Sequence, residues 1–503
     1  MNSLFKPVSY AQGTAQAVAA TFVWKFISFV NALLLAAYFG ATYKTDIYFY
    51  VVMVIGFGIA FVQRLNQTIL IPEAMFLHEK NPQHARQFLT MWFYVYVGAG
   101  VVFGAAGSLC AVHGWGLLSR FSPAELASQQ IVLILGAWWF GLQLVAYYLQ
   151  AVAEMFKYFT AAWLGALNAF FPLVCLVLFG KHVGPAGMLY GFVAANIVQI
   201  LLLVYAFKTQ AGFSGRPAWY PLTRRARHNM AAGQSLAVLD IVNSLLPVYL
   251  MSGLNAGVIT ALNYCRQFTD CATEIFTART ANIAKIALTE TAARRREQEF
   301  NEQFLMSTRL LVLILAPLAV FSCYFAPQIV ELFFQRGEFT SQDTRQTVLF
   351  LRPMLFVMLL SAPGFLQNSA VAARRKIKES FPYALSAGLL LTGLLGVVIP
   401  RCGAFSYPYL LGVGLVIGFM LNAVFFRKNL PFVAYGKHLW LTLRLTGLAA
   451  VSLLPAICVS KLLPSGCLWQ IIGCGGVFVG IYALLVGWAK ELQRLRDFLR
   501  NNF

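Results

Sequence analysis

Long apolar stretches recur along the whole chain, and they restrict its fold more than any other feature. Each has about twenty residues, the length that a helix needs to cross the hydrocarbon core of a bilayer. About fourteen stretches can be counted, starting near Gln16, Asp46, Phe88, Ser128, Tyr158, Pro185, Met230, Gly257, Phe304, Thr347, Phe381, Phe405, Leu439 and Cys467. The sequence therefore predicts an all-α polytopic membrane protein with about fourteen transmembrane helices.

The composition agrees with a membrane protein and excludes a soluble one. Hydrophobic residues make up 59% of the 503 positions and charged residues 11%, which is too apolar for a soluble domain. A net charge of +20 would indicate nucleic acid binding in a soluble protein, but membrane topology explains it here, so no nucleic acid partner is expected. The nine cysteines form no CxxC or Cys/His cluster, so no metal site is predicted.

Lysine and arginine are distributed unevenly between alternate connections. If the N-terminus is cytoplasmic, the outward connections hold Lys44, Arg120, Lys181, Arg336, Arg345, Arg401 and Lys461. The inward connections hold many more cations, namely Lys80, Arg86, Lys157, Lys208, Arg224, Arg225, Arg227, Arg294 to Arg296, Arg374, Arg375, Lys376, Lys378, Arg427, Lys428 and Lys437. The positive-inside rule therefore predicts cytoplasmic termini. The first apolar stretch is long enough to span, so no cleavable signal is expected.

A basic connection divides the first twelve stretches into two sets of six. Its Gly, Pro and Arg content is typical of a linker. We therefore predict an N-terminal lobe at 1–207, a cytoplasmic linker at 208–229, a C-terminal lobe at 230–428, and two further spans with a basic tail at 429–503. Two six-helix lobes are one way in which a transporter encloses a cavity.

A few ionisable residues remain inside the apolar stretches, where a charge is costly unless it faces protein or water. Lys25 lies in the first stretch. The eighth stretch carries Arg266 with Asp270 and Glu274 at helical spacing, which places all three on one face. Further polar positions are Arg64, Asp240 and Arg352.

The cations Lys25, Arg64, Arg266 and Arg352 would give a central cavity the character that suits a phosphate or pyrophosphate. Two other interpretations stay open: Arg266 and Asp270 could pair as structural contacts between helices, and Lys25 or Arg64 could snorkel to an interface. The first two stretches contain no carboxylate after Asp46, which argues against a proton-coupled exporter of cationic drugs.

Three short segments carry a family resemblance. The first runs from Leu332 to Thr344, LFFQRGEFTSQDT, and includes Arg336, Gly337 and Asp343. The second is FGATYKTD, which ends at Asp46, and the third is AARR, whose last two residues are Arg374 and Arg375. The first is similar to the LFxRGxFxxxDT signature of the MurJ/MviN lipid II flippases, a family of the MOP exporter superfamily, and the others resemble segments at the same places in that family. We expect Arg336-Gly337 to form a turn and Thr340 or Ser341 to cap the following helix.

The resemblance implies a divergent flippase with two alternating-access lobes in the bacterial cytoplasmic membrane. Its cargo would be a polyprenyl-pyrophosphate-linked saccharide, lipid II or a related cell-envelope precursor, moved from the inner to the outer leaflet. No covalent chemistry is needed, so neither catalytic residues nor a cofactor are expected. The resemblance also implies coupling to an ion gradient or the membrane potential, with Asp240, Asp270 and Glu274 as candidate sites.

The sequence differs from the family pattern at the cations expected to bind the pyrophosphate. Lys25 matches the first cation of the SRxxGFxRD pattern, whereas Asn31 and Ala32 stand at its end, and the PNxxRRxFAEGA run is absent around Arg64. An exopolysaccharide or O-antigen repeat unit is therefore the main alternative cargo. Less favoured are a non-transporting pseudo-flippase that binds envelope-synthesis proteins and a membrane saccharide polymerase or ligase, which usually needs a larger outer loop.

Overall fold

The structure is a computed structural model, and it describes residues 10–158, 161–210, 224–294, 296–462 and 466–489, together with 491 and 493. Every regular element within these residues is a helix. In chain order they are α1 Tyr10–Phe39, α2 Tyr43–Leu65, η1 Asn66–Leu70, α3 Ile71–Lys80, α4 Pro82–Leu109, α5 Ala111–Leu118, α6 Pro123–Ser128, α7 Gln130–Met155, α8 Ala161–Leu164, α9 Leu167–Val183, α10 Ala186–Gln210, α11 Arg224–Met251, α12 Val258–Ala272, η2 Thr273–Ala278, α13 Arg279–Ala293, α14 Glu297–Tyr324, α15 Ala326–Phe334, α16 Ser341–Ala373, α17 Ile377–Cys402, η3 Ala404–Ser406, α18 Tyr407–Asn429, α19 Tyr435–Ser460 and α20 Cys467–Trp488.

Many of these helices are long enough to cross a membrane. Among the described residues, 11 have the required length and apolar composition, and shorter apolar helices lie at Leu167–Val183 and Val238–Met251. The consecutive elements α12, η2 and α13 occupy the remaining predicted position, near Gly257. The predicted fold class, an all-helical protein with many spans, is confirmed.

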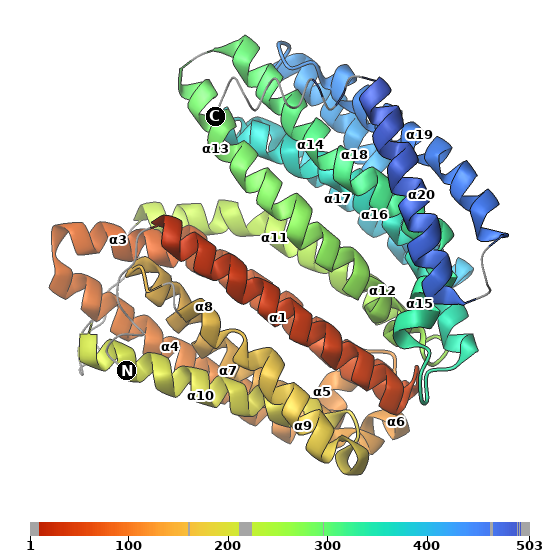
Figure 1. Ribbon diagram of the computed structural model, residues 1–503. Coiled ribbons are helices and arrows are strands. Elements are labelled where there is room, and N and C mark those ends of the chain that lie inside the picture. Colours follow the sequence, from red (N-terminus) through yellow and green to blue (C-terminus); the bar gives the residue numbers. More distant parts are fainter. Residues whose placement is uncertain are drawn as a thin grey trace. The chain divides into compact units, whose positions relative to one another are not determined.

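The chain forms two compact units (Figure 1). Unit 1 comprises Met1–Thr260 with Arg336–Phe339, and unit 2 comprises Ala261–Gln335 with Thr340–Phe503. The division falls after α11, one helix later than the predicted lobe boundary, because α11 packs on α2. Residues 211–223 of the predicted linker lie outside the described residues, and the predicted lobe boundaries stay a prediction.

Unit 1 is built around a close crossing of α4 and α7. Gly100 and Gly141 face each other there, and a Cβ added to either would meet the carbonyl oxygen of the other. One turn further along α4, Gly104 lies against the indole of Trp138. Small residues allow two backbones to approach closely, which is how helices associate where lipid gives no hydrophobic driving force. α9 packs on α10, and α10 in turn packs on α7.

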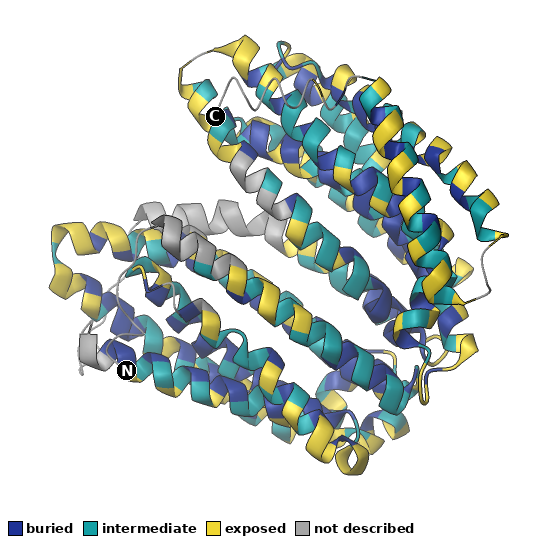
Figure 2. Cartoon of the chain, in the orientation of Figure 1, coloured by how far each residue is buried: buried dark blue, intermediate teal, exposed yellow. Residues whose placement is uncertain are grey.

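Unit 2 is built around α14 and α16, which contact each other and α13, α18 and α19. Large aromatic side chains fill its interior, among them the fully buried Phe300, Phe304 and Phe350. Figure 2 shows the buried residues on the helix sides that face neighbours within a unit, and exposed residues on the outer sides. Only 11% of the residues in the most apolar stretch of α17 are buried. An exposed apolar surface of this kind is suited to lipid.

Candidate functional site

Asp46, from the second resemblance segment, is buried in unit 1, where it caps the first turn of α12. Its carboxylate accepts hydrogen bonds from the backbone N–H groups of Gly257 (2.5 Å) and Thr260 (2.8 Å), and from the Thr260 hydroxyl (2.6 Å). Gly257 precedes the helix and has a φ of +87°, so the capping position has no side chain of its own. Asp46 supplies that function from α2, and its negative charge suits a helix N-terminus.

The Arg336-Gly337 turn of the signature packs on the end of α1, as part of unit 1. The N–H of Glu338 donates to the carbonyl of Ala37 (2.9 Å), which lies in the last turn of α1 and has no partner further along that helix. Gly337 has a φ of +60°, and a Cβ there would meet the same carbonyl. The predicted turn is confirmed, and glycine is required at it for both reasons.

Two further signature residues, Thr340 and Asp343, belong to unit 2 and form the cap of α16. The Thr340 hydroxyl accepts from the N–H of Asp343 (3.4 Å), while the Asp343 carboxylate accepts from the N–H of Thr340 (2.8 Å). This reciprocal pair is a capping box. Of the two expected capping residues, Thr340 is the one that caps the helix.

Arg374 and Arg375 end α16 at its other terminus. The guanidinium of Arg374 lies between the rings of Phe300 and Phe432, 4.7 Å and 4.5 Å from their centroids. Arg375 is exposed and has a φ of +56°, the left-handed conformation that often ends a helix. Arg374 therefore joins α16 to α14 and to the loop before α19 through cation–π contacts.

Two of the predicted substrate-binding cations belong to unit 1. Lys25 is half-buried on α1, and its ammonium lies 4.6 Å from the ring centroid of Trp24. Arg64, near the end of α2, forms an ion pair with Asp240 of α11 at 3.4 Å. The structure thus brings together a predicted substrate-binding residue and a predicted coupling residue, whose side chains are 47% and 70% exposed.

The other two predicted cations belong to unit 2. Arg266 is half-buried on α12 and donates to the phenol oxygen of Tyr407, the first residue of α18, at 2.9 Å. Arg352 is exposed on α16. Asp270 is also exposed, while Glu274 is half-buried in the π-helix η2. The helical period that placed Arg266, Asp270 and Glu274 on one face therefore changes after Ala272.

Polar residues that we did not predict lie in both units. In unit 1, the buried Asn196 donates to Asn168, which donates to Gln199. In unit 2, Arg309 and Arg444 pair with Glu491. The rule that singled out Lys25 could have found Arg309 and Arg444, since both lie inside apolar stretches. Within the described part of the chain, no group of three or more His, Cys, Asp or Glu side chains could hold a metal ion.

Comparison with solved structures shows which known proteins share the fold. The fold matches a structure described as "Lipid II flippase MurJ, inward closed conformation" with a TM-score of 0.77 at 16% identity, covering 96% of this chain and 99% of that one. It also matches an inward-facing multidrug resistance MATE family transporter of the MOP superfamily, with a TM-score of 0.63 at 12% identity, covering 82% and 99%. The fold is that of MOP superfamily transporters.

Sequence comparison places the chain more narrowly. The family model described as "Lipid II flippase MurJ" matches residues 35–468. A probable lipid II flippase MurJ from Borreliella burgdorferi is 23% identical over 417 residues, covering 79% of this chain and 78% of the relative. The chain belongs to the MurJ lipid II flippase family, as the three segments predicted, and it is a multi-pass protein of the bacterial inner membrane.

Proposed function

We propose that this chain moves lipid II, or a closely related polyprenyl-pyrophosphate-linked saccharide, from the inner to the outer leaflet by alternating access. The observation that carries the proposal is the family match over residues 35–468. No bond in the cargo is made or broken, so the residues of the chain bind and release the headgroup without chemical conversion. The polyprenyl tail remains in lipid while the headgroup crosses, because a pyrophosphate in hydrocarbon is very costly.

The distribution of charge supports a headgroup-binding role for Lys25, Arg64, Arg266 and Arg352. Arg64, Asp240, Asp270 and Arg352 are exposed although they lie on helices at predicted span positions, and charged side chains at such positions normally face a water-filled cavity or protein. A cation of either unit that contacts the pyrophosphate replaces part of its hydration. Arg266 is the best oriented of the four, because Tyr407 holds its guanidinium.

The energy source and the orientation complete the proposal. Asp240, Asp270 and Glu274 are the carboxylates that would respond to a coupling ion or to the membrane potential. Asp240 already pairs with Arg64, so release of this pair would link ion binding to a cation of the cargo site. We place both termini in the cytoplasm, because the positive-inside rule favours the orientation in which the Lys- and Arg-rich connections face inward.

Reconstitution with two precursors tests the function. The purified chain is placed in liposomes with lipid II or with an exopolysaccharide precursor on the same polyprenyl pyrophosphate, and the headgroup that reaches the outer leaflet is measured. We expect lipid II to be transported, and Lys25→Ala or Arg266→Ala to reduce the rate at least tenfold, since each removes a charge-assisted contact worth about 1.5–3 kcal/mol. Arg345→Ala, an exposed residue in the first turn of α16, is the matched control.

The outcomes separate the candidate functions. Faster transport of the exopolysaccharide precursor would assign the chain to the alternative cargo. Binding without transport would indicate a pseudo-flippase, and a lengthened saccharide would indicate a polymerase or ligase. Unchanged transport in both alanine variants would contradict the cation site.

A further inference from the structure

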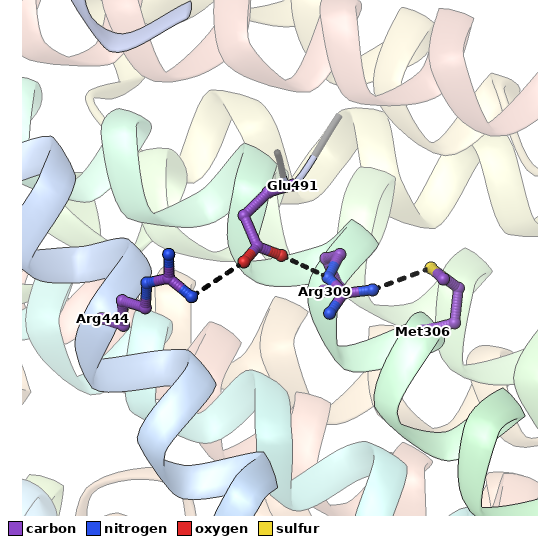
Figure 3. A network of polar contacts seen from close by, with 4 residues as sticks. All are labelled: Met306, Arg309, Arg444 and Glu491. Carbon is purple, nitrogen blue, oxygen red and sulfur yellow. Dashed lines mark hydrogen bonds and ion pairs between the residues drawn. The ribbon is translucent and has the colours of Figure 1, made fainter. Parts of the chain in front are cut away.

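A carboxylate beyond the last span is completely buried between two arginines of unit 2. Glu491 has 0% side-chain exposure, and its two oxygens lie 2.6 Å from Nε of Arg309 on α14 and 3.0 Å from NH1 of Arg444 on α19. Figure 3 shows Glu491 between the two guanidinium groups, with the sulfur of Met306 on the other side of Arg309. We call these three charged residues the Glu491 cluster.

The cluster is asymmetric in charge, because one carboxylate serves two cations. Arg309 is only 14% exposed and Arg444 is 39% exposed, so neither is fully hydrated. Loss of Glu491 would leave two poorly hydrated positive charges facing each other. Removal of one partner from a buried ion pair is strongly destabilising for this reason, whereas replacement of the whole set by apolar side chains is often tolerated.

α19 has a second polar attachment that does not involve Glu491. His438 is buried on α19 between Thr308 of α14 (2.7 Å) and Gln367 of α16 (3.2 Å). Asn422 of α18 donates to the Gln367 oxygen, so Gln367 presents its NH₂ group to Nε2 of His438. Nδ1 then carries the proton and donates to Thr308, whose hydroxyl donates to the Phe304 carbonyl. This His438 cluster holds α19 against α14 and α16.

α20 is attached to α14 by aromatic side chains near its middle and by an ion pair beyond its end. Near its middle, Phe478 packs on Phe321 with centroids 5.2 Å apart, and Tyr482 donates to the Leu313 carbonyl at 3.3 Å. Beyond Tyr482, the next polar contact to α14 that the described residues provide is the Glu491 cluster. The carboxylate thus attaches the chain at Glu491, beyond the last of these aromatic contacts.

We propose that Glu491 is a positioning residue that fastens the C-terminal end of α20 to α14 and α19. Glu491 is then part of the packed unit, and the two C-terminal spans move with α14 during transport. Only this last statement rests on the proposed function. The attachment itself is a property of the folded chain.

Hydrogen exchange on the full-length chain tests the attachment, with substrate left out. In Glu491→Gln we expect amides in the last two turns of α20 to exchange at least about tenfold faster, since the lost pair interaction exceeds the free energy of a tenfold change. The amides of α19 around His438 should keep their protection. Glu379→Gln, which breaks the exposed pair with Lys376, is the matched control and should change nothing in α20.

The apolar triple variant Arg309→Met/Arg444→Met/Glu491→Met tests whether Glu491 is needed to neutralise the two arginines or only to fill space between the helices. We expect it to recover most of the protection lost in Glu491→Gln. Unchanged exchange in Glu491→Gln, or a triple variant that exchanges as fast as Glu491→Gln, would overturn the proposal. A transport assay on the same samples should give slower flipping in Glu491→Gln than in the triple variant. A wild-type chain that flips nothing would count against the proposed function and leave the exchange result standing.

Discussion

In unit 1, single residues at helix ends connect helices that are far apart in the sequence, and Asp46 is the clearest case. Its carboxylate satisfies two backbone N–H groups and a hydroxyl at the start of α12. Asp46→Ala leaves the two buried backbone N–H groups without an acceptor, at about 1–3 kcal/mol each, whereas the Thr260 hydroxyl keeps the Thr45 hydroxyl as a partner at 3.1 Å. We therefore expect Asp46→Ala to lower the melting temperature of the purified protein in detergent by several degrees, as followed by intrinsic fluorescence.

Asp343→Ala is the control for that prediction, because the Asp343 carboxylate also accepts from a backbone N–H at the start of a helix, in the α16 capping box, but lies on the surface. An exposed cap contributes about 1 kcal/mol, so the loss should be smaller. Equal losses in the two variants would mean that burial and the three bonds to α12 add nothing to an ordinary cap.

At the scale of helices, the α4–α7 crossing depends on the absence of side chains. A Cβ on Gly100 would meet the backbone of Gly141, and backbone atoms cannot move aside as a flexible side chain can. We expect Gly100→Ala to force the helices apart and to cost about 1–3 kcal/mol, measured as a lower midpoint in thermal unfolding.

Gly98, on the same helix, gives a matched control. No atom lies within 4 Å of a Cβ added there, and alanine is favoured over glycine in a helix by up to about 1 kcal/mol. Gly98→Ala should therefore be neutral or slightly stabilising. If both alanine variants melt like the wild type, close approach at this crossing is not what stabilises unit 1.

For the whole molecule, the sequence predicted the helices better than their contacts. Span length and apolarity are local properties, so the predicted positions coincide with observed helices and the Thr340 cap could be predicted from its motif. Partners far apart in the chain could not be predicted: Asp46 with Thr260, Arg64 with Asp240 and Arg309 with Glu491 depend on which helices pack together. The helix-face argument for Glu274 assumed a uniform α-helical period, which the π-helix η2 interrupts.

Topology gives a last prediction for the whole chain, and native cysteines can test it. Cys110 and Cys402 are exposed at the ends of α4 and α17, and the proposed orientation puts both at the outer surface. Cys458, in the last turn of α19, is also exposed and lies at the same proposed side. A membrane-impermeant maleimide added to intact spheroplasts should therefore label the wild type, and Cys110→Ser/Cys402→Ser/Cys458→Ser should lose most of the label. In that background, Lys378→Cys, near the start of α17, should react only after the membrane is permeabilised. Labelling of Lys378→Cys from outside would mean that the chain has the opposite orientation, because α17 crosses the membrane once between these two positions.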